Sequence, residues 1–318
     1  MLAWTDPDWL ASAHTWIRAE LERLGLETTA AIEQPHIRPW STVMRVPTSE
    51  GNLWFKANMP SQAYEAAVVT ILERLRPGLM PELRAVDLDN GWMLMGDAGE
   101  PLREAVSRER DLKRWLDVLP LYAELQIAAA PALDELVAAG TPHRRLSSLA
   151  DDYDGLLDEV RGLTPEERHD LAAWRQRVRE MCDALAERAI PETIQHDDLH
   201  QEQVFIRDGA YVLSDWADAC VAHPFFSLSV TLEGNLGWGL DDIQGSVDIR
   251  PFRDAYLEPF TRYAPADELR DAAATALRLG WICRAVNAQR WASALDSDER
   301  ERQLDGVAIR LRMFAEGL

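Results

Sequence analysis

The chain has 318 residues, of which 47% are hydrophobic and 27% charged, the composition of an ordinary folded protein. This length can bury a large core and suggests two domains, or two lobes of one domain. The formal net charge of −21 argues against a nucleic-acid partner, because nucleic-acid binding depends on basic patches. The same charge would attract a cationic small molecule, although it also fits a role in solubility alone.

Targeting and redox features are sparse. No apolar run approaches the roughly 18–20 residues of a membrane span, and the acidic N-terminus is unlike a signal peptide. We therefore expect a cytoplasmic protein without a membrane partner. Cys182, Cys220 and Cys283 are far apart and form no CxxC pair, which favours buried reduced thiols over disulfides or structural zinc.

Residues 1–96 predict a small lobe that mixes helices and strands. Apolar residues recur at helical spacing in two segments, and four short β-like segments pair across turns of Gly, Asn and Asp. The predicted elements are a helix at 6–24, strands at 42–46 and 53–57, a helix at 61–75, and strands at 83–88 and 92–95.

Residues 97–318 predict a larger lobe that is almost wholly helical. The exception is 203–214, where two short strands flank an Asp208-Gly209 turn, a strong hairpin signal. The fold class is therefore α+β, with an antiparallel sheet in the small lobe. The predicted helices lie at 102–118, 120–139, 147–160, 165–189, 225–235, 252–262, 265–294 and 299–316.

Lysine is rare in this chain. Of 33 basic residues only Lys56 and Lys113 are lysines, so arginine is the default cation. Lys56 lies inside an apolar strand pattern, Leu53-Trp54-Phe55-Lys56-Ala57, where a lysine needs a specific reason. The alternative is a lysine that only extends its charged end to the surface.

Residues with chemical potential surround the hairpin. Asp198 precedes its first strand and Asp215 ends its second, so we expect the two carboxylates to be neighbours. One carboxylate can accept a hydroxyl proton while the other holds a metal, as phosphoryl transfer requires. A metal-dependent hydrolase is the alternative, since His196, Asp198 and His200 are metal-ligand types at tight spacing. The remaining histidines are scattered.

The pattern His196-x-Asp198-x-x-x-x-Gln203, followed by Asp215-Trp216 after a hairpin, resembles the aminoglycoside phosphotransferase family. That resemblance implies a bilobal protein-kinase-like fold and an enzyme that uses ATP and Mg²⁺ to phosphorylate a small-molecule hydroxyl. It implies that Asp198 is the catalytic base and that His196 supports the loop. Asp215 and Gln203 would bind Mg²⁺.

The resemblance extends into the first lobe and covers roughly residues 37–235. It implies that Lys56 binds the α- and β-phosphates and that Glu65 holds this lysine in place, with Glu73 as a weaker rival. Leu94-Met95-Gly96-Asp97 resembles the connector whose backbone binds adenine, so we expect Met95 and Asp97 to contact the nucleotide.

Three departures from the family pattern stand out. Gln203 replaces the usual asparagine, 38–42 replaces a glycine-rich phosphate loop, and His223 stands where the family commonly has the aspartate of Gly-Asp-Pro. The first departure leaves open a catalytically weak, kinase-like nucleotide-binding protein. Trp238 lies in a glycine-flanked segment beside Asp241 and Asp242. An aromatic ring in this setting can stack on a cationic acceptor. The alternative is that Trp238 belongs to a surface loop without such a role.

Overall fold

The structure, a computed structural model, describes residues 2–317. Its contacts group the chain into two compact units, Met1–Glu100 with Phe205–Ala217, and Pro101–Val204 with Asp218–Leu318. A late segment of the sequence therefore belongs to the first unit. The predicted division between residues 96 and 97 remains a prediction.

The first unit is built on a five-stranded antiparallel sheet with the strand order β1-β2-β3-β5-β4. β2 and β3 pair along their whole length, with Thr48 opposite Gly51, so a two-residue turn joins them. The strand β1 was not predicted, because it contains Pro35 and only an edge strand tolerates proline. The strands are β1(Glu33–Ile37), β2(Ser41–Thr48), β3(Gly51–Asn58), β4(Leu83–Asp87) and β5(Trp92–Gly96).

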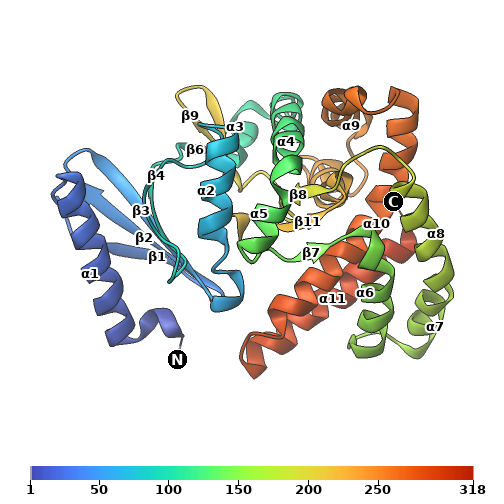
Figure 1. The fold of residues 1–318 in the computed structure, drawn as a ribbon, viewed down its shortest axis with the longest axis horizontal. Helices are drawn as coiled ribbons and strands as arrows, with labels where there is room; N and C mark the ends of the chain where they lie inside the picture. The colour runs from blue at the N-terminus through green and yellow to red at the C-terminus, as the bar shows by residue number, and fades with distance from the viewer. Residues whose placement is uncertain (1, 318) are drawn as a thin grey trace. The chain divides into compact units, whose positions relative to one another are not determined.

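Two helices, α1(Pro7–Leu24) and α2(Glu65–Leu75), cover opposite faces of this sheet (Figure 1). The α1 face is aromatic: the Trp16 ring lies 5.8 Å from both Phe55 and Trp92. The side chain of Asp6 caps the first turn of α1. Since side chains alternate along a strand, the residue after Phe55 faces α2.

The second unit is mostly helical. Its longest helix, α10, packs against α6, α8, α9 and α11. The helices are α3(Leu102–Glu109), α4(Trp115–Ala129), α5(Leu133–Ala138), α6(Leu146–Glu159), α7(Pro165–Ala173), α8(Arg175–Ala186), α9(Arg250–Leu257), α10(Ala266–Ala292) and α11(Ser297–Glu316).

Short elements complete the chain. A three-stranded sheet that the sequence did not predict has the order β7-β11-β8 and supports the loop after β8. The predicted hairpin at 203–214 is confirmed as β9 and β10. These strands are β6(Glu100–Pro101), β7(His143–Arg144), β8(Thr193–Gln195), β9(Val204–Arg207), β10(Ala210–Leu213) and β11(Cys220–Ala222). The short helical turns are η1(Ala3–Thr5), η2(Pro60–Gln62), η3(Ala130–Ala132), η4(Trp216–Asp218), η5(Pro224–Phe226), η6(Ser229–Glu233), η7(Leu236–Trp238) and η8(Glu258–Arg262).

Several predicted helix limits are wrong. Arg110 has left-handed backbone (φ 52°) and ends α3, whereas α4 continues through Pro120. The proline costs one backbone hydrogen bond, but the helix survives because its apolar face is buried at Trp115 and Tyr122. The predicted helix at 165–189 breaks at Trp174. The predicted helix at 225–235 forms over 224–233, with η5 as a 3-10 turn and η6 as a π-helix.

One segment, Trp115–Ala138, is long and apolar enough to cross a membrane by length and composition. The expectation that no segment reaches this threshold is therefore wrong. A core helix passes the same test, and α4 packs against β8 and α9. The three cysteines are buried and free, as predicted.

Candidate active site

Lys56 lies on β3 and points to the α2 face of the sheet. Its Nζ is 2.8 Å from Glu65 Oε1 and 2.6 Å from Asp215 Oδ1, and the residue is 7% exposed. Burial lowers the pKa of Lys56, but the two carboxylates outweigh it and raise the pKa above its usual value. The lysine is therefore a fixed buried cation and not a solvated surface residue.

Glu65 is the first residue of α2 and is 1% exposed. Besides Lys56, its carboxylate accepts hydrogen bonds from Asn58 Nδ2 (2.5 Å) and from the Trp216 backbone N–H (2.8 Å). Burial raises the pKa of Glu65, and Lys56 opposes that change. Glu73, the rival in the sequence, accepts from the Gly78 N–H instead. The structure thus brings Lys56 together with Glu65.

Asp215 follows β10 and has a left-handed backbone with φ of 63°. Aspartate tolerates this region better than most residues, and such outliers concentrate at functional sites. One carboxylate oxygen binds Lys56, and the side chain is 43% exposed. The neighbouring Trp216 is fully buried and anchors the turn. A partly exposed carboxylate of this kind suits a hard cation such as Mg²⁺.

Met95 and Asp97 lie at the end of β5. Met95 is in register with Trp54 on β3 and Leu83 on β4, and the next residue's N–H donates to the Glu82 carbonyl. The Asp97 carboxylate accepts from the Gly99 N–H (2.8 Å) and from Trp54 Nε1 (3.3 Å). These groups are engaged within the first unit, and the adenine-binding role of Met95 and Asp97 remains a prediction.

In the second unit the loop after β8 carries His196 and Asp198. His196 is fully buried, and its backbone N–H donates to the Tyr122 hydroxyl on α4 (2.8 Å). Leu199 is also buried, and Thr231 donates its hydroxyl hydrogen to the Leu199 carbonyl (2.9 Å). The loop is therefore anchored on both sides of Asp198, whose side chain is 32% exposed.

The Asp198 carboxylate has an arginine and a histidine as neighbours. Its Oδ1 accepts from Arg284 Nη2 at 2.7 Å, and its Oδ2 lies 3.6 Å from His200 Nε2. Burial raises the pKa of Asp198, but Arg284 and His200 outweigh it and hold the pKa well below its usual range. Asp198 is thus an ionised hydrogen-bond acceptor throughout the neutral range.

Gln203 directly precedes β9 and lies next to His200. Its N–H donates to the His200 carbonyl (2.9 Å), and its amide Nε2 lies 3.4 Å from His200 Nε2. His200 Nδ1 accepts a hydrogen bond from the Glu202 N–H. The imidazole is therefore assigned the tautomer with its hydrogen on Nε2, and this hydrogen favours the oxygen of the Gln203 amide as the atom opposite it. With its oxygen turned toward His200 Nε2, the Gln203 amide would share that oxygen between the imidazole and a bound metal.

A buried ionic cluster lies behind this loop, and sequence reasoning missed it. Asp197 is 3% exposed and accepts from Gln195 (3.1 Å), Asn287 (3.0 Å) and Arg284 (3.2 Å). Burial raises the pKa of Asp197 to about 6. Arg284 also binds Asp218 at 2.8 Å. The available signal was an arginine inside the apolar stretch 279–288, comparable with the position of Lys56.

The hydrolase alternative requires metal ligands from His196, Asp198 and His200, but the structure brings metal-ligand side chains together at another place. Among residues 2–317, one group of such side chains has its ligand atoms within 4.8 Å of one another: Asp197, Cys220 and Cys283. Gln195 Nε2 donates to both sulfurs at 3.1 Å. His196 and His200 are outside that group, so the geometry does not support a His196/Asp198/His200 hydrolase centre.

The departures from the family pattern have structural explanations. The 38–42 segment contains the tight turn between β1 and β2 and the first two residues of β2. The Arg38 N–H closes the turn by donating to the Ser41 carbonyl (2.9 Å). His223 is fully buried, accepts from the Phe225 N–H (3.3 Å), and burial lowers its pKa to about 3. The loop that holds the half-buried Trp238 is fixed by a hydrogen bond from the Ser246 hydroxyl.

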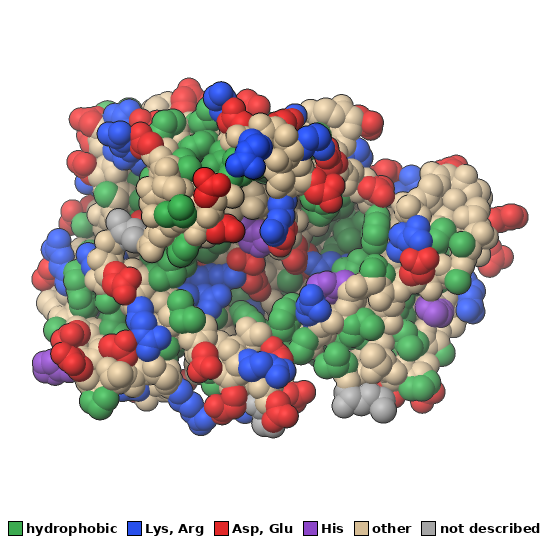
Figure 2. Space-filling view, turned by 180° about the vertical axis from the view of Figure 1, so that it is seen from behind, with side chains coloured by type: hydrophobic (Ala, Val, Ile, Leu, Met, Phe, Trp, Pro, Cys, Tyr) green, Lys and Arg blue, Asp and Glu red, His purple; other side chains and the backbone are tan. Residues whose placement is uncertain are grey.

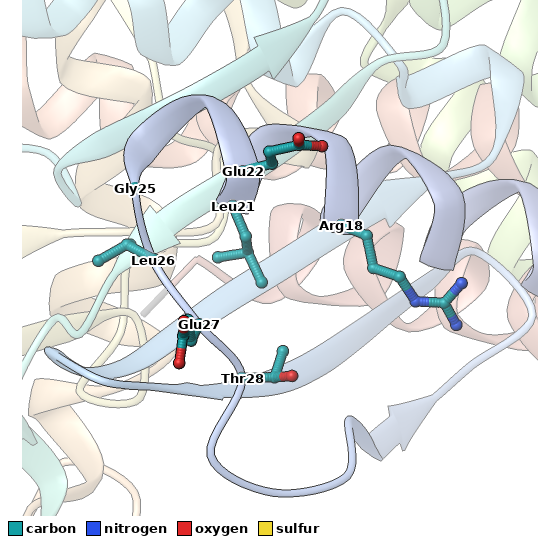
Figure 3. A pocket seen from close by; sticks show the side chains of 7 residues that line it. All are labelled: Arg18, Leu21, Glu22, Gly25, Leu26, Glu27 and Thr28. Atoms are coloured by element: carbon teal, nitrogen blue, oxygen red, sulfur yellow. The ribbon is translucent and has the colours of Figure 1, made fainter.

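Figure 2 shows how charged side chains are distributed on one face of the protein. On the face in Figure 2, acidic and basic side chains interleave, and no large basic patch is visible there. Figure 3 shows a pocket in the first unit at the end of α1. None of the predicted site residues lines it. Its lining residues are Arg18, Leu21, Glu22, Gly25, Leu26, Glu27 and Thr28.

The small lobe with its antiparallel sheet, the helical lobe and the two sets of charged groups define a bilobal, protein-kinase-like fold. The chain belongs to the phosphotransferase enzyme family, whose model matches residues 39–269. It is therefore a small-molecule kinase, a phosphotransferase with an alcohol group as acceptor. The predicted fold class and family are confirmed.

Solved structures support the same fold at low sequence identity. The chain is similar to a choline/ethanolamine kinase family protein from Mesorhizobium loti (15% identity, TM-score 0.60, 95% of each chain covered). It is similar to Plasmodium vivax ethanolamine kinase (14%, 0.61, 99% of this chain and 91% of that one). It is also similar to aminoglycoside 2'-phosphotransferase-IIIa in a GDP complex (13%, 0.61, 94% and 98%). No curated protein matches by sequence.

Proposed function

We propose that the chain transfers the γ-phosphoryl group of ATP to a hydroxyl of a cationic small molecule, with Mg²⁺ as cofactor. The observation that carries this proposal is the network in which Lys56 binds both Glu65 and Asp215. A buried cation held by a buried carboxylate and a partly exposed one is the arrangement that phosphate binding and metal binding need on the nucleotide side.

Asp215 and Gln203 would hold Mg²⁺ through a carboxylate and an amide oxygen, ligand types that this cation prefers. Bound Mg²⁺ supplies charge neutralisation on the ATP phosphates. Lys56 would add a second positive charge for the same phosphates, and Glu65 would keep it oriented if Asp215 bound the metal.

Asp198 would accept a hydrogen bond from the acceptor hydroxyl and orient it. Its lowered pKa makes it a weak base. A weak base is sufficient, because phosphoryl transfer through a loose transition state depends mainly on positioning and charge. The anchored loop between Tyr122 and Thr231 fixes that position.

A cationic acceptor, aminoglycoside-like, an amino sugar or an amino alcohol, is supported by the net charge of −21. Proteins named for ethanolamine and for aminoglycosides share the fold, which favours an amine-bearing molecule. Asp241 and Asp242 are exposed beside Trp238 and add negative charge there. We further propose that the reaction takes place in the cytoplasm, where the three free thiols stay reduced.

A coupled assay of ADP release over paired acceptors tests this function. Each amine, such as glucosamine or ethanolamine, is compared with its neutral analogue, glucose or ethylene glycol, alongside aminoglycosides. Turnover is measured with ATP or GTP, and with Mg²⁺ or EDTA. We expect Mg²⁺-dependent turnover that is faster with the amine of each pair.

The two lysines of the chain provide a matched control. Lys56→Met should abolish turnover, whereas Lys113→Met should not, because Lys113 is exposed and pairs with the neighbouring Asp111. Saturable ATP binding without turnover of any acceptor would favour the nucleotide-binding alternative and contradict the proposal. Equal turnover of amines and neutral analogues would contradict the cationic acceptor alone.

A further inference from the structure

Arg284, on α10, binds three carboxylates at once. Its Nη2 donates to Asp198 Oδ1 at 2.7 Å, and its Nη1 donates to Asp218 at 2.8 Å and to Asp197 at 3.2 Å. The residue is 6% exposed. A buried arginine surrounded by carboxylates is a fixed structural cation, because each partner compensates part of its desolvation.

The guanidinium is itself immobilised. Asn287, one helical turn further along α10, donates to the same Asp197 oxygen at 3.0 Å. Asn287 accepts in turn from Arg144 Nε on β7 at 2.9 Å. The planar fork of arginine can satisfy neighbouring acceptors in fixed directions, which the point charge of lysine does not do. Arg284 therefore ties the loop after β8 to the helix α10 through fixed hydrogen bonds.

We propose that Arg284 is the positioning residue for Asp198. By binding Oδ1 it fixes the carboxylate in one orientation and leaves Oδ2, on the side of His200, for the acceptor hydroxyl. This inference rests on the proposed function, because it assigns Arg284 a part in the same phosphoryl transfer. Arg284 itself touches no reacting atom.

The surroundings of Asp198 support this assignment. The groups that favour its ionised form are Arg284 from α10, and His196 and His200 from its own loop. Arg310 from α11 also acts on it electrostatically. Of these, Arg284 makes the short bond. Removing Arg284 should therefore change both the orientation and the proton affinity of the Asp198 carboxylate, whereas ATP binding by the first-unit residues should be unaffected.

Three variants test the proposal with steady-state kinetics from pH 4 to 8. Arg284→Gln should lower kcat about 100-fold, the cost of a misplaced reacting group, with KM for ATP unchanged within about twofold. Its acid limb should move to higher pH. Arg284→Lys should recover part of kcat and return the acid limb toward the wild-type position. Arg278→Gln is the control, since Arg278 lies on the same helix but binds the Phe314 and Ala315 carbonyls.

The inference is overturned if Arg284→Gln keeps the wild-type kcat and acid limb, or if Arg278→Gln reproduces the whole profile of Arg284→Gln. If Arg284→Gln does not fold, Arg284→Lys decides by the same two readouts. An NMR titration of labelled aspartate carboxyl groups needs no acceptor. An unchanged Asp198 titration in Arg284→Gln overturns the inference even if the wild type turns over no substrate. A wild type without turnover would refute only the proposed function.

Discussion

Phe55 and Lys56 are adjacent on β3, and their side chains serve opposite faces of the same sheet. The Phe55 ring lies 5.8 Å from Trp16 of α1, whereas Lys56 Nζ lies 2.8 Å from Glu65 of α2. One strand thus carries the packing of the first helix and the charge of the candidate site. Substitutions at the two positions should therefore separate stability from activity.

Phe55→Ala should destabilise the protein without removing a charged group. Phe55 is fully buried, with the Trp92 ring at 5.7 Å, and replacing such a side chain by alanine costs about 3–5 kcal/mol. Urea unfolding followed by tryptophan fluorescence measures the loss. Leu88→Ala is the control, because Leu88 is 60% exposed and should change the free energy of unfolding by less than about 0.5 kcal/mol. Equal effects of the two substitutions would show that the α1 face is not a packed core.

Glu65→Gln should weaken nucleotide binding more than Glu73→Gln, although both residues lie on α2. Glu65 is buried and binds Lys56, while Glu73 accepts from the exposed Gly78 N–H. Loss of the Glu65 charge leaves Lys56 paired with Asp215 and frees it to move, so we expect KM for ATP to rise about tenfold. That factor corresponds to about 1.4 kcal/mol, a reasonable value for one charged hydrogen bond. The same KM in both variants would contradict the assignment of Glu65.

The sequence predicted the parts of the molecule that local patterns encode. The helix at 6–24 and the hairpin at 203–214 follow from apolar periodicity and from a Gly-containing turn, and both form. Lys56 was found because lysine is rare in this chain. Local periodicity does not encode the break at Arg110 or the survival of α4 through Pro120, since both depend on tertiary packing.

The ionic cluster shows the corresponding limit for the site. Asp197 and Arg284 are 87 residues apart. Their pairing depends on the contact of α10 with β8 and β11, which Cys283 makes with Gln195 and Cys220. No local pattern connects them. Arginine is also the default cation here, so Arg284 did not stand out as Lys56 did. The expected closeness of Asp198 and Asp215 stays a prediction, since they belong to different units.

His223→Asn should flatten the acid dependence of stability. Burial lowers the pKa of His223 from 6.5 to about 3. Between these two pH values His223 is therefore protonated in the unfolded chain and neutral in the folded chain. The contribution of His223 is fully present above pH 6.5 and is lost as the pH falls toward 3, at about 1.4 kcal/mol per pH unit. Asparagine keeps an acceptor for the Phe225 N–H without this titration.

Urea unfolding at pH 7, 6, 5 and 4 measures the slope for wild type and variant. His169→Asn is the matched control, because His169 is exposed and should leave the slope as it is in the wild type. If His223→Asn retains the full wild-type slope between pH 6 and 4, the buried neutral state of His223 is wrong.

Gln203→Asn should lower the Mg²⁺ concentration needed for half-maximal turnover. The Gln203 amide lies 3.4 Å from His200 Nε2, and shortening the side chain by one methylene draws the amide away from the imidazole. The amide oxygen is then out of reach of the His200 imidazole and available to the metal. Turnover at limiting Mg²⁺ should therefore rise several-fold, while kcat at saturating Mg²⁺ changes little. Gln201→Asn, two residues earlier, controls for any glutamine-to-asparagine change in this loop. A Mg²⁺ dependence that is unchanged in Gln203→Asn, or shifted equally in Gln201→Asn, would remove Gln203 from the metal site and leave Asp215 as its proposed protein ligand.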